Sequence, residues 1–284
     1  MPSGNSLRVL AIDTTAADCS VSFRVEQDGA VKQCTERQAL TAGQSRAVLE
    51  QVQAVREQGR SWGVQPRSTR GQESGAEQAL VKPDLIAFGA GPGAFTGLRV
   101  ACGVAQGLAF GWDCPVVGVD SLTTLAWQAW RAWQAEPREG MSRPRIAVAL
   151  DVRMQELAFA VYEPTGAPWI AGQSVLKWPT PLADPILCSP EQAVAMIEAQ
   201  TLAASPMILA GDAFKVYPAL HRWQLATSAE QPDATAVAEL GALGFRMGRA
   251  IDPAQAAPFY LRDKVALDRH EQERARFERR QKGV

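Results

Sequence analysis

The residues of this chain that could do chemistry gather at two turns, and the first follows a short apolar run. Leu7–Asp13 predicts a buried strand that ends in a carboxylate, and Thr14 and Thr15 follow it directly. A carboxylate with two hydroxyls can hold a hydrated cation and a phosphate oxygen. It can equally cap the turn by accepting hydrogen bonds from backbone N–H groups. The residues alone leave both interpretations open.

The second turn is glycine-rich and has the sequence GAGPGAFTG at residues 89–97, between a predicted strand and a predicted helix. Glycines at such a turn let backbone amides face an anion at the helix N-terminus. Gly91 and Gly93 would then surround a phosphate together with the Asp13 turn. The turn lacks the Lys-Ser/Thr pair of a phosphate-binding P-loop, which excludes that motif.

A dinucleotide site is a third interpretation of the same turn. Gly89, Gly91 and Ala94 match the dinucleotide fingerprint, and Asp113 follows Gly89 by 24 residues, near the expected acidic position. However, Pro92 lies inside the turn, and the turn is not in the first strand–helix unit of the chain. Both departures weigh against a dinucleotide.

The helix predicted over 96–110 carries an apolar stripe and two interior glycines. The stripe consists of Leu98, Ala101, Ala105 and Leu108. Gly103 and Gly107 are four residues apart, and each costs a helix about 1 kcal/mol relative to alanine. Such glycines let another helix approach closely. That helix could belong to the same domain or to another subunit.

Other catalytic or metal-binding signals are weak. There is no G-x-S-x-G motif, and His221 and His270 are expected at the surface. No cluster of His, Cys and carboxylates has zinc-ligand spacing, so we expect no metal. The five cysteines include no C-x-x-C pair and are expected to be free thiols.

The hydrophobic periodicity predicts strands mixed with helices, which is typical of an α/β fold. We expect strands at 7–13, 18–26, 31–38, 83–89, 115–119, 146–151, 156–162, 170–177 and 206–211, and helices at 44–58, 96–110, 121–133, 189–200 and 235–248. Residues 59–79 and 136–144 are polar connections.

The beginning of the second half of the chain is similar to the beginning of the first, which suggests an internal duplication; chance similarity of two ordinary hairpins is the alternative. A strand that ends in Asp151 and its following strand match the Asp13 strand and its successor at an offset of 138 residues. Asp151 is followed by Val-Arg-Met rather than by hydroxyls, so a symmetric phosphate clamp is poorly supported. We expect an N-terminal domain at 1–135, a C-terminal domain at 145–266 and a charged extension at 267–284.

The composition is that of an ordinary globular protein. The chain has 284 residues, 46% of them hydrophobic, and a net charge of −1, which excludes general disorder and gives no sign of a strongly basic nucleic-acid binder. The N-terminus has no signal-peptide pattern, and the weakly polar stretch at 100–112 is too short to span a bilayer. We expect a cytoplasmic protein that does not bind a membrane.

Five segments in order resemble the TsaB (YeaZ) family, whose members are partner subunits in tRNA threonylcarbamoyladenosine synthesis. They are LRVLAIDTTAADCSVSF at 7–23, FGAGPGAFTGLRVACGVAQGLA at 88–109, VGVDSLTTLA at 117–126, ALDVRMQELAFAVY at 149–162 and PFYLRDKVA at 258–266. The block GPGAFTGLR at 91–99 is the most specific of them. The resemblance runs over most of residues 7–266.

The resemblance implies two ribonuclease-H-like domains of the actin/Hsp70/sugar-kinase type, with mixed sheets flanked by helices. It implies a chain related to the transferase TsaD but without the His-x-x-x-His metal pair, because the matching helix at 44–58 has no histidine. The expected partners are a TsaD-like subunit, a TsaE-like ATPase and a second copy, with tRNA reached only through the complex. No cofactor is expected, unless ATP or ADP binds at a shared subunit interface.

The resemblance also places the partner interface on the two helices of the N-terminal domain. Its residues would be Gln44, Val48, Val52, Val55, Leu98, Ala101, Gly103, Ala105, Gly107 and Leu108. Three departures from the family stand out: a long connection at 59–82, an extension after Ala266, and Gln44 where the family has histidine.

The resemblance therefore implies a non-catalytic subunit that binds and activates TsaD. The alternative is a nucleotide hydrolase or M22-type peptidase that uses the Asp13 turn. A dinucleotide oxidoreductase is the third hypothesis.

Overall fold

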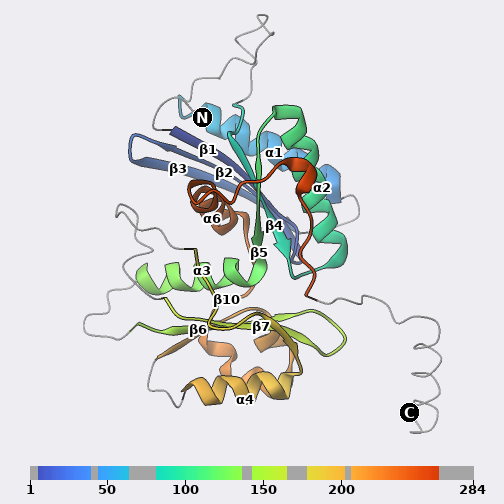
Figure 1. The fold of residues 1–284 in the computed structure, drawn as a ribbon, viewed down its shortest axis with the longest axis vertical. Helices are drawn as coiled ribbons and strands as arrows, with labels where there is room; N and C mark the ends of the chain where they lie inside the picture. The colour runs from blue at the N-terminus through green and yellow to red at the C-terminus, as the bar shows by residue number, and fades with distance from the viewer. Residues whose placement is uncertain are drawn as a thin grey trace, which may run out of the picture.

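Two five-stranded sheets form the framework of the protein (Figure 1). The structure is a computed structural model that describes residues 6–39, 44–63, 81–135, 143–164, 178–201 and 206–261. The first sheet has the order β3 (Ala30–Ala39), β2 (Asp18–Gln27), β1 (Ser6–Asp13), β4 (Leu85–Gly91) and β5 (Val116–Asp120). The second has the order β10 (Thr227–Ala229), β9 (Met207–Ala210), β6 (Arg145–Asp151), β7 (Leu157–Tyr162) and β8 (Ile186–Cys188).

The two sheets have the same topology. In each, the first three strands pair antiparallel, and the first strand also pairs in parallel with the fourth, which pairs in parallel with the fifth. β1 and β6, which end in Asp13 and Asp151, occupy the same central place. This equivalence is what the internal repeat in the sequence predicts.

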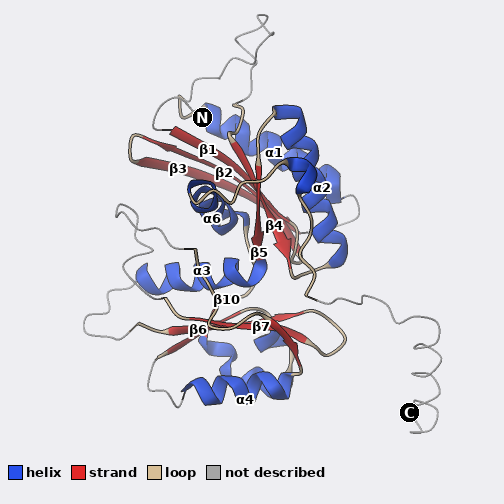
Figure 2. Ribbon diagram, in the orientation of Figure 1, coloured by secondary structure: helices blue, strands red, loops and turns tan. Residues whose placement is uncertain are grey.

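Helices cover both faces of the first sheet (Figure 2). α1 (Gln44–Arg60) and α2 (Phe95–Trp112) pack on one face, and α6 (Ala234–Arg246) packs on the other. The alternation along β1 explains this, because Leu10 and Ile12 point toward α1 and α2 while Val9 and Ala11 point toward α6. In the second sheet, α4 (Pro190–Thr201) and the short α5 (Ala213–Val216) cover the face away from the first sheet.

The remaining helix, α3 (Ser121–Ala135), lies between the sheets (Figure 1). Its residues Leu122, Leu125 and Trp130 belong to one continuous apolar core with Val9 of the first sheet and Ile146 of the second. A hydrogen bond of 3.2 Å also joins Thr123 of α3 to the Tyr162 hydroxyl of β7. The two halves of the chain therefore share a core.

The chain returns to the first sheet after completing the second. α6 contacts β1, β4 and β5, although the sequence analysis assigned residues 145–266 to a C-terminal domain. A Cβ on Gly241 would overlap the Ala87 side chain, so this glycine lets α6 lie close to β4. The second face of the first sheet is apolar and has to be covered, and α6 covers it.

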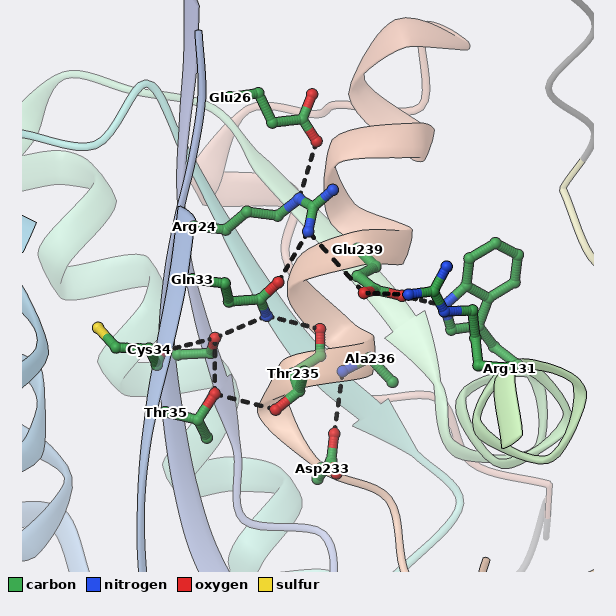
Figure 3. Close-up of polar contacts among 12 residues, drawn as sticks. Arg24, Glu26, Gln33, Cys34, Thr35, Arg131, Asp233, Thr235, Ala236 and Glu239 are labelled. Atoms are coloured by element: carbon green, nitrogen blue, oxygen red, sulfur yellow. Dashed lines mark hydrogen bonds and ion pairs between the residues drawn. The ribbon is translucent and has the colours of Figure 1, made fainter. Parts of the chain in front are cut away.

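A polar cluster fastens α6 to the sheet and to α3 (Figure 3). The Glu239 carboxylate accepts a 2.6 Å hydrogen bond from the Trp127 indole and lies 3.8 Å from the Arg24 guanidinium. Arg24 also pairs with Glu26 at 2.8 Å, and Gln33 donates to the Thr235 carbonyl at 3.0 Å. These half-buried contacts join β2, β3, α3 and α6.

The last described segment, 251–261, is termed the C-terminal strap. Ile251 pairs with Val116 at the edge of β5, and the Phe259 N–H donates to the Ala90 carbonyl at 2.7 Å. Between these points the Gln106 amide of α2 donates to the carbonyls of Pro253 and Ala256 at 3.0 and 3.2 Å. The strap therefore runs along α2.

The strands and helices predicted within the described ranges are present, with small shifts at their ends. The structure adds elements that the sequence analysis did not predict: β8, α5, β10 and two 3-10 helices, at Pro218–Ala226 and Pro253–Gln255. Four features lie wholly or largely outside the described residues: the strand predicted at 170–177, most of the connections 59–82 and 136–144, and the extension 267–284.

Removing the Glu239 carboxylate tests whether the two halves unfold together. Glu239→Ala removes the carboxylate that accepts from the Trp127 indole and one of the two carboxylates that pair with Arg24, so we expect a loss of about 2 kcal/mol in the free energy of unfolding. Denaturation should still show one transition, because both sheets share the α3 core. The control is Glu198→Ala, which removes an exposed ion pair to Arg222 and should cost less than about 0.5 kcal/mol. Equal effects of the two variants would contradict this role.

Candidate functional site

The Asp13 carboxylate is buried at the end of β1 and is only 1% exposed. One oxygen, Oδ1, accepts from the Thr15 backbone N–H at 2.9 Å and from the Thr15 hydroxyl at 2.8 Å. The other, Oδ2, has no hydrogen-bond partner among the described residues. Burial raises the pKa of Asp13 to about 6, and the hydrogen bonds from Thr15 only partly oppose this rise.

The glycine turn packs directly on the Asp13–Thr15 turn. The Thr14 hydroxyl donates to the Gly97 carbonyl at 2.6 Å, and the Ala94 N–H donates to the Thr15 carbonyl at 2.9 Å. A Cβ on Gly93 would lie 2.5 Å from the Thr15 carbonyl oxygen, and one on Gly97 would overlap the Thr14 carbonyl. These glycines serve the close approach of two backbone segments.

The same contact covers the carboxylate. A Cβ on Gly89 would overlap Asp13 Oδ2, and Thr14 and Thr15 are as buried as Asp13. Gly91 has a φ of +109° and faces the Phe259 carbonyl of the strap. The geometry favours the capping interpretation of the turn, because a phosphate or cation would have to displace the glycine turn to reach the carboxylate.

The equivalent turn of the second sheet is also closed by its own neighbours. The Tyr217 hydroxyl donates to Asp151 Oδ1 at 2.7 Å, and the Arg153 guanidinium lies 3.5 Å from Asp151 Oδ2. The Asp212 carboxylate accepts from the Asp151 N–H at 2.9 Å. Val152 and Arg153 follow Asp151 where Thr14 and Thr15 follow Asp13, as the sequence indicated.

The position of Asp113 contradicts the dinucleotide hypothesis. Asp113 is the left-handed C-cap of α2, with a φ of 50°. It therefore lies one whole 18-residue helix away from Gly91, which is roughly 27 Å. Gly91, the second glycine of the fingerprint and the one whose backbone a pyrophosphate would approach, faces the Phe259 carbonyl instead.

Among the described residues, neither the cysteines nor the possible metal ligands form a second candidate site. All five cysteines are buried free thiols, and burial raises the pKa of Cys114 to about 11. Within the described ranges no group of three or more His, Cys, Asp or Glu side chains could hold a metal ion. His221 bonds the Lys215 carbonyl at 2.9 Å, and His270 lies outside the described residues.

The structure corrects most of the predicted interface. Val48, Val52 and Val55 are at most 4% exposed, because this stripe of α1 packs on the first sheet. The same holds for three residues of α2, namely Leu98, Ala101 and Ala105, and Leu108 packs partly against this core. These side chains cannot meet a partner without unfolding their own domain. Gln44 begins α1, and its side chain lies outside the description.

The outward side of α2 keeps the two predicted glycines and adds a third. A Cβ on Gly103, Gly107 or Gly111 would meet nothing within 4 Å. Apolar side chains flank them, with Phe95 42% and Phe110 61% exposed. We call this surface the glycine face; it consists of Phe95, Val100, Gly103, Val104, Gly107, Phe110 and Gly111. The spacing of four residues between Gly107 and Gly111 was the signal that could have added the third glycine.

The sequence is similar to a known family model and to curated proteins. The family model "TsaD: tRNA N6-adenosine threonylcarbamoyltransferase" matches residues 74–267. The tRNA threonylcarbamoyladenosine biosynthesis protein TsaB of Haemophilus influenzae is 32% identical over 187 residues, which is 66% of this chain and 73% of that protein. TsaB of Escherichia coli is 32% identical over 157 residues, about half of each chain at 55%.

Two solved structures from Pseudomonas aeruginosa are also similar. An uncharacterized protein with similarity to peptidase YeaZ is 28% identical, with a TM-score of 0.65 over 90% of this chain and 100% of that chain. YeaZ itself is 25% identical, with a TM-score of 0.62 over the same shares. None of the helices in the described ranges combines the length and hydrophobicity that crossing a membrane takes.

The repeated mixed sheets define a duplicated ribonuclease-H-like fold of the actin/Hsp70/sugar-kinase type. Within this class the chain belongs to the TsaB (YeaZ) family, inside the wider group that the TsaD family model describes.

The raised pKa of Asp13 predicts a pH effect on stability. The folded pKa of about 6 exceeds the ordinary value of 3.8, so folding favours the protonated acid, and stability is lost as the pH rises from about 4 through 6. In Asp13→Asn this loss should disappear. We expect the free energy of unfolding of the variant, relative to that of wild type, to rise by up to about 3 kcal/mol between pH 4 and pH 7. Denaturation at the two pH values measures it. Parallel pH profiles would contradict the burial of a charge here.

The two kinds of glycine in α2 predict opposite effects of alanine. Gly103→Ala places a methyl group in open space and should raise the free energy of unfolding by about 0.5–1 kcal/mol through helix propensity. Gly97→Ala forces a methyl group into the Thr14 carbonyl and should destabilise by about 2 kcal/mol or more. Thermal denaturation compares them, and a destabilised Gly103→Ala monomer would show that Gly103 serves internal packing.

Proposed function

We propose that this chain is a non-catalytic docking subunit in the synthesis of threonylcarbamoyladenosine in tRNA, and that it binds and activates a TsaD-type subunit. The observation that carries the proposal is the glycine face of α2. Three glycines lie on the outer side of one helix, each beside open space. Each glycine lowers the stability of an isolated helix, and no packing contact within the described part of the monomer requires a glycine at these positions.

Close approach by another surface supplies that reason. Without side chains at Gly103, Gly107 and Gly111, a partner helix can lie near the α2 backbone. Phe95 and Phe110 offer exposed aromatic surface near the two ends of α2, and such residues are enriched at interfaces. The buried half of α2 holds the helix on the sheet, so this surface is rigid before a partner binds.

The absence of a catalytic role is supported by the state of the Asp13 turn. A nucleotide hydrolase or an M22-type peptidase would need an accessible carboxylate or nucleophile there, and the glycine turn covers Asp13. The α3 core between the sheets also opposes movement of one half against the other. Both features suit a subunit that acts as a surface.

The names of the relatives support the pathway in which we place the chain. The curated relatives are TsaB proteins of tRNA threonylcarbamoyladenosine biosynthesis, and the matching family model is that of the threonylcarbamoyltransferase TsaD. Our proposal includes a TsaE-like ATPase as a further partner, tRNA contact only through the complex, and self-association through the same face. It places ATP or ADP, if either is bound, at an interface shared between subunits.

Gly103→Leu tests the docking face. The added side chain points to open space, so the monomer should fold normally, whereas a partner helix should be held off. We expect wild type to co-elute with the TsaD-type subunit of the same organism on a sizing column. We expect Gly103→Leu to bind at least about tenfold more weakly in titration calorimetry.

The matched control is Ala132→Leu, a similar enlargement at an exposed position of α3, which should bind like wild type. Full-strength binding by Gly103→Leu would place the interface elsewhere, and separate elution of the wild-type proteins would count against docking itself. ATP turnover by the isolated chain that Asp13→Ala abolishes would favour the hydrolase.

A further inference from the structure

A single cation, Arg99, lies at the N-terminal end of α2 and is held by two aromatic rings. Its guanidinium carbon is 3.8 Å from the centre of the Phe95 ring, and its Nε donates to the Tyr260 hydroxyl at 3.4 Å. The Phe95 and Tyr260 rings are 5.9 Å apart. Among the described residues no carboxylate forms an ion pair with Arg99.

Within the part of the chain that the structure describes, α2 offers Arg99 no compensating negative charge. The 18 residues of α2 include no Asp or Glu, and the first turn has no side-chain cap. The unpaired N–H groups there add positive potential. In the strap, the Asp252 carboxylate accepts a hydrogen bond from the Ala254 N–H at 2.8 Å. The next residue, Pro253, accepts from Gln106, which lies about two helical turns along α2 from Arg99.

Arg99 borders the glycine face. It lines, with Phe95, Thr96, Val100, Gly103 and Val104, an open hollow of about 400 Å³. Arg99 and Gln106 both contact the strap, whereas Trp112, on the other side of the helix, contacts Arg56 of α1. The exposed carboxylates of α1 are therefore not on the side of α2 that Arg99 occupies.

We propose that Arg99 selects the partner of the glycine face: it pairs with a carboxylate on an apolar helix of a different subunit laid along α2. This inference rests on the proposed function and names the chemistry of its interface. The guanidinium is already oriented by Phe95 and Tyr260, so little conformational freedom is lost when a carboxylate binds. Arginine and aromatic residues in such settings carry much of the energy of an interface.

The same charge disfavours a second copy of the chain. In a two-fold dimer built on α2, the same surface contributes from both copies. Because α2 supplies an arginine and no carboxylate, each Arg99 would face an interface without an acidic side chain from the opposite α2. Discrimination between partners then comes from one unpaired charge, attractive for an acidic helix and unfavourable for a copy.

Three substitutions at Arg99 test the inference on the full chain with the TsaD-type subunit of the same organism. Arg99→Gln should weaken this complex about tenfold and Arg99→Glu about a hundredfold or more, whereas Arg99→Lys should retain part of the affinity. Self-association, followed by sedimentation equilibrium, should stay equal or become tighter in Arg99→Gln. Wild-type binding should weaken with salt more than Arg99→Gln binding.

Arg222→Gln is the control, because Arg222 also lies over an aromatic ring, that of Trp223, but in the other sheet's domain. It should bind like wild type. Thermal denaturation checks that each variant is folded. If wild type binds and Arg99→Glu binds equally well, the inference is overturned while the docking function stands. Equal weakening of both kinds of association would also overturn it, and a wild type that does not bind would overturn the proposed function as well.

Discussion

The contact between the Asp13–Thr15 turn and the glycine turn at 89–97 is the constraint on which the rest of the molecule depends. Two backbone segments meet there so closely that Gly89, Gly93 and Gly97 have no room for side chains. The contact places the first turn of α2, with the Thr14 hydroxyl bonded to the Gly97 carbonyl. It also closes the buried Asp13 carboxylate, which with Thr14 and Thr15 could have held a hydrated cation and a phosphate. A site with the residue types of ligand binding thus serves to position a helix.

A second constraint is the core that both sheets share. α3 buries apolar side chains against each of them, and α6 crosses back from the end of the second sheet to cover the first. Opening the two halves would expose this core to water at a cost of about 25 cal/mol for each Å² of apolar surface. The molecule is therefore built to hold its outer surfaces in fixed relation. Such rigidity suits the docking role that we propose for the α2 surface.

Local patterns predicted the elements and the turns, but they could not say what each element packs against. The apolar run that forms β1, the glycine turn and the repeat around Asp151 all correspond to features of the structure. The stripe of Val48, Val52 and Val55 shows that one side of α1 is buried, and periodicity cannot distinguish the domain's own sheet from a partner. The contacts of α6 and of Tyr260 with residues more than 150 positions earlier left no local signal.

The two halves of the fold close their equivalent turns in different ways. In the second sheet the Tyr217 hydroxyl bonds the Asp151 carboxylate at the turn, and the segment that follows β9 is the four-residue α5. In the first sheet the turn is closed by backbone, and the segment that follows β4 is the 18-residue α2. Closure by glycines leaves the outer side of α2 free, because no side chain of α2 is needed to fill the turn. The glycines of the turn let two backbone segments meet over Asp13, and those on the outer side of α2 leave open the surface that we propose for docking.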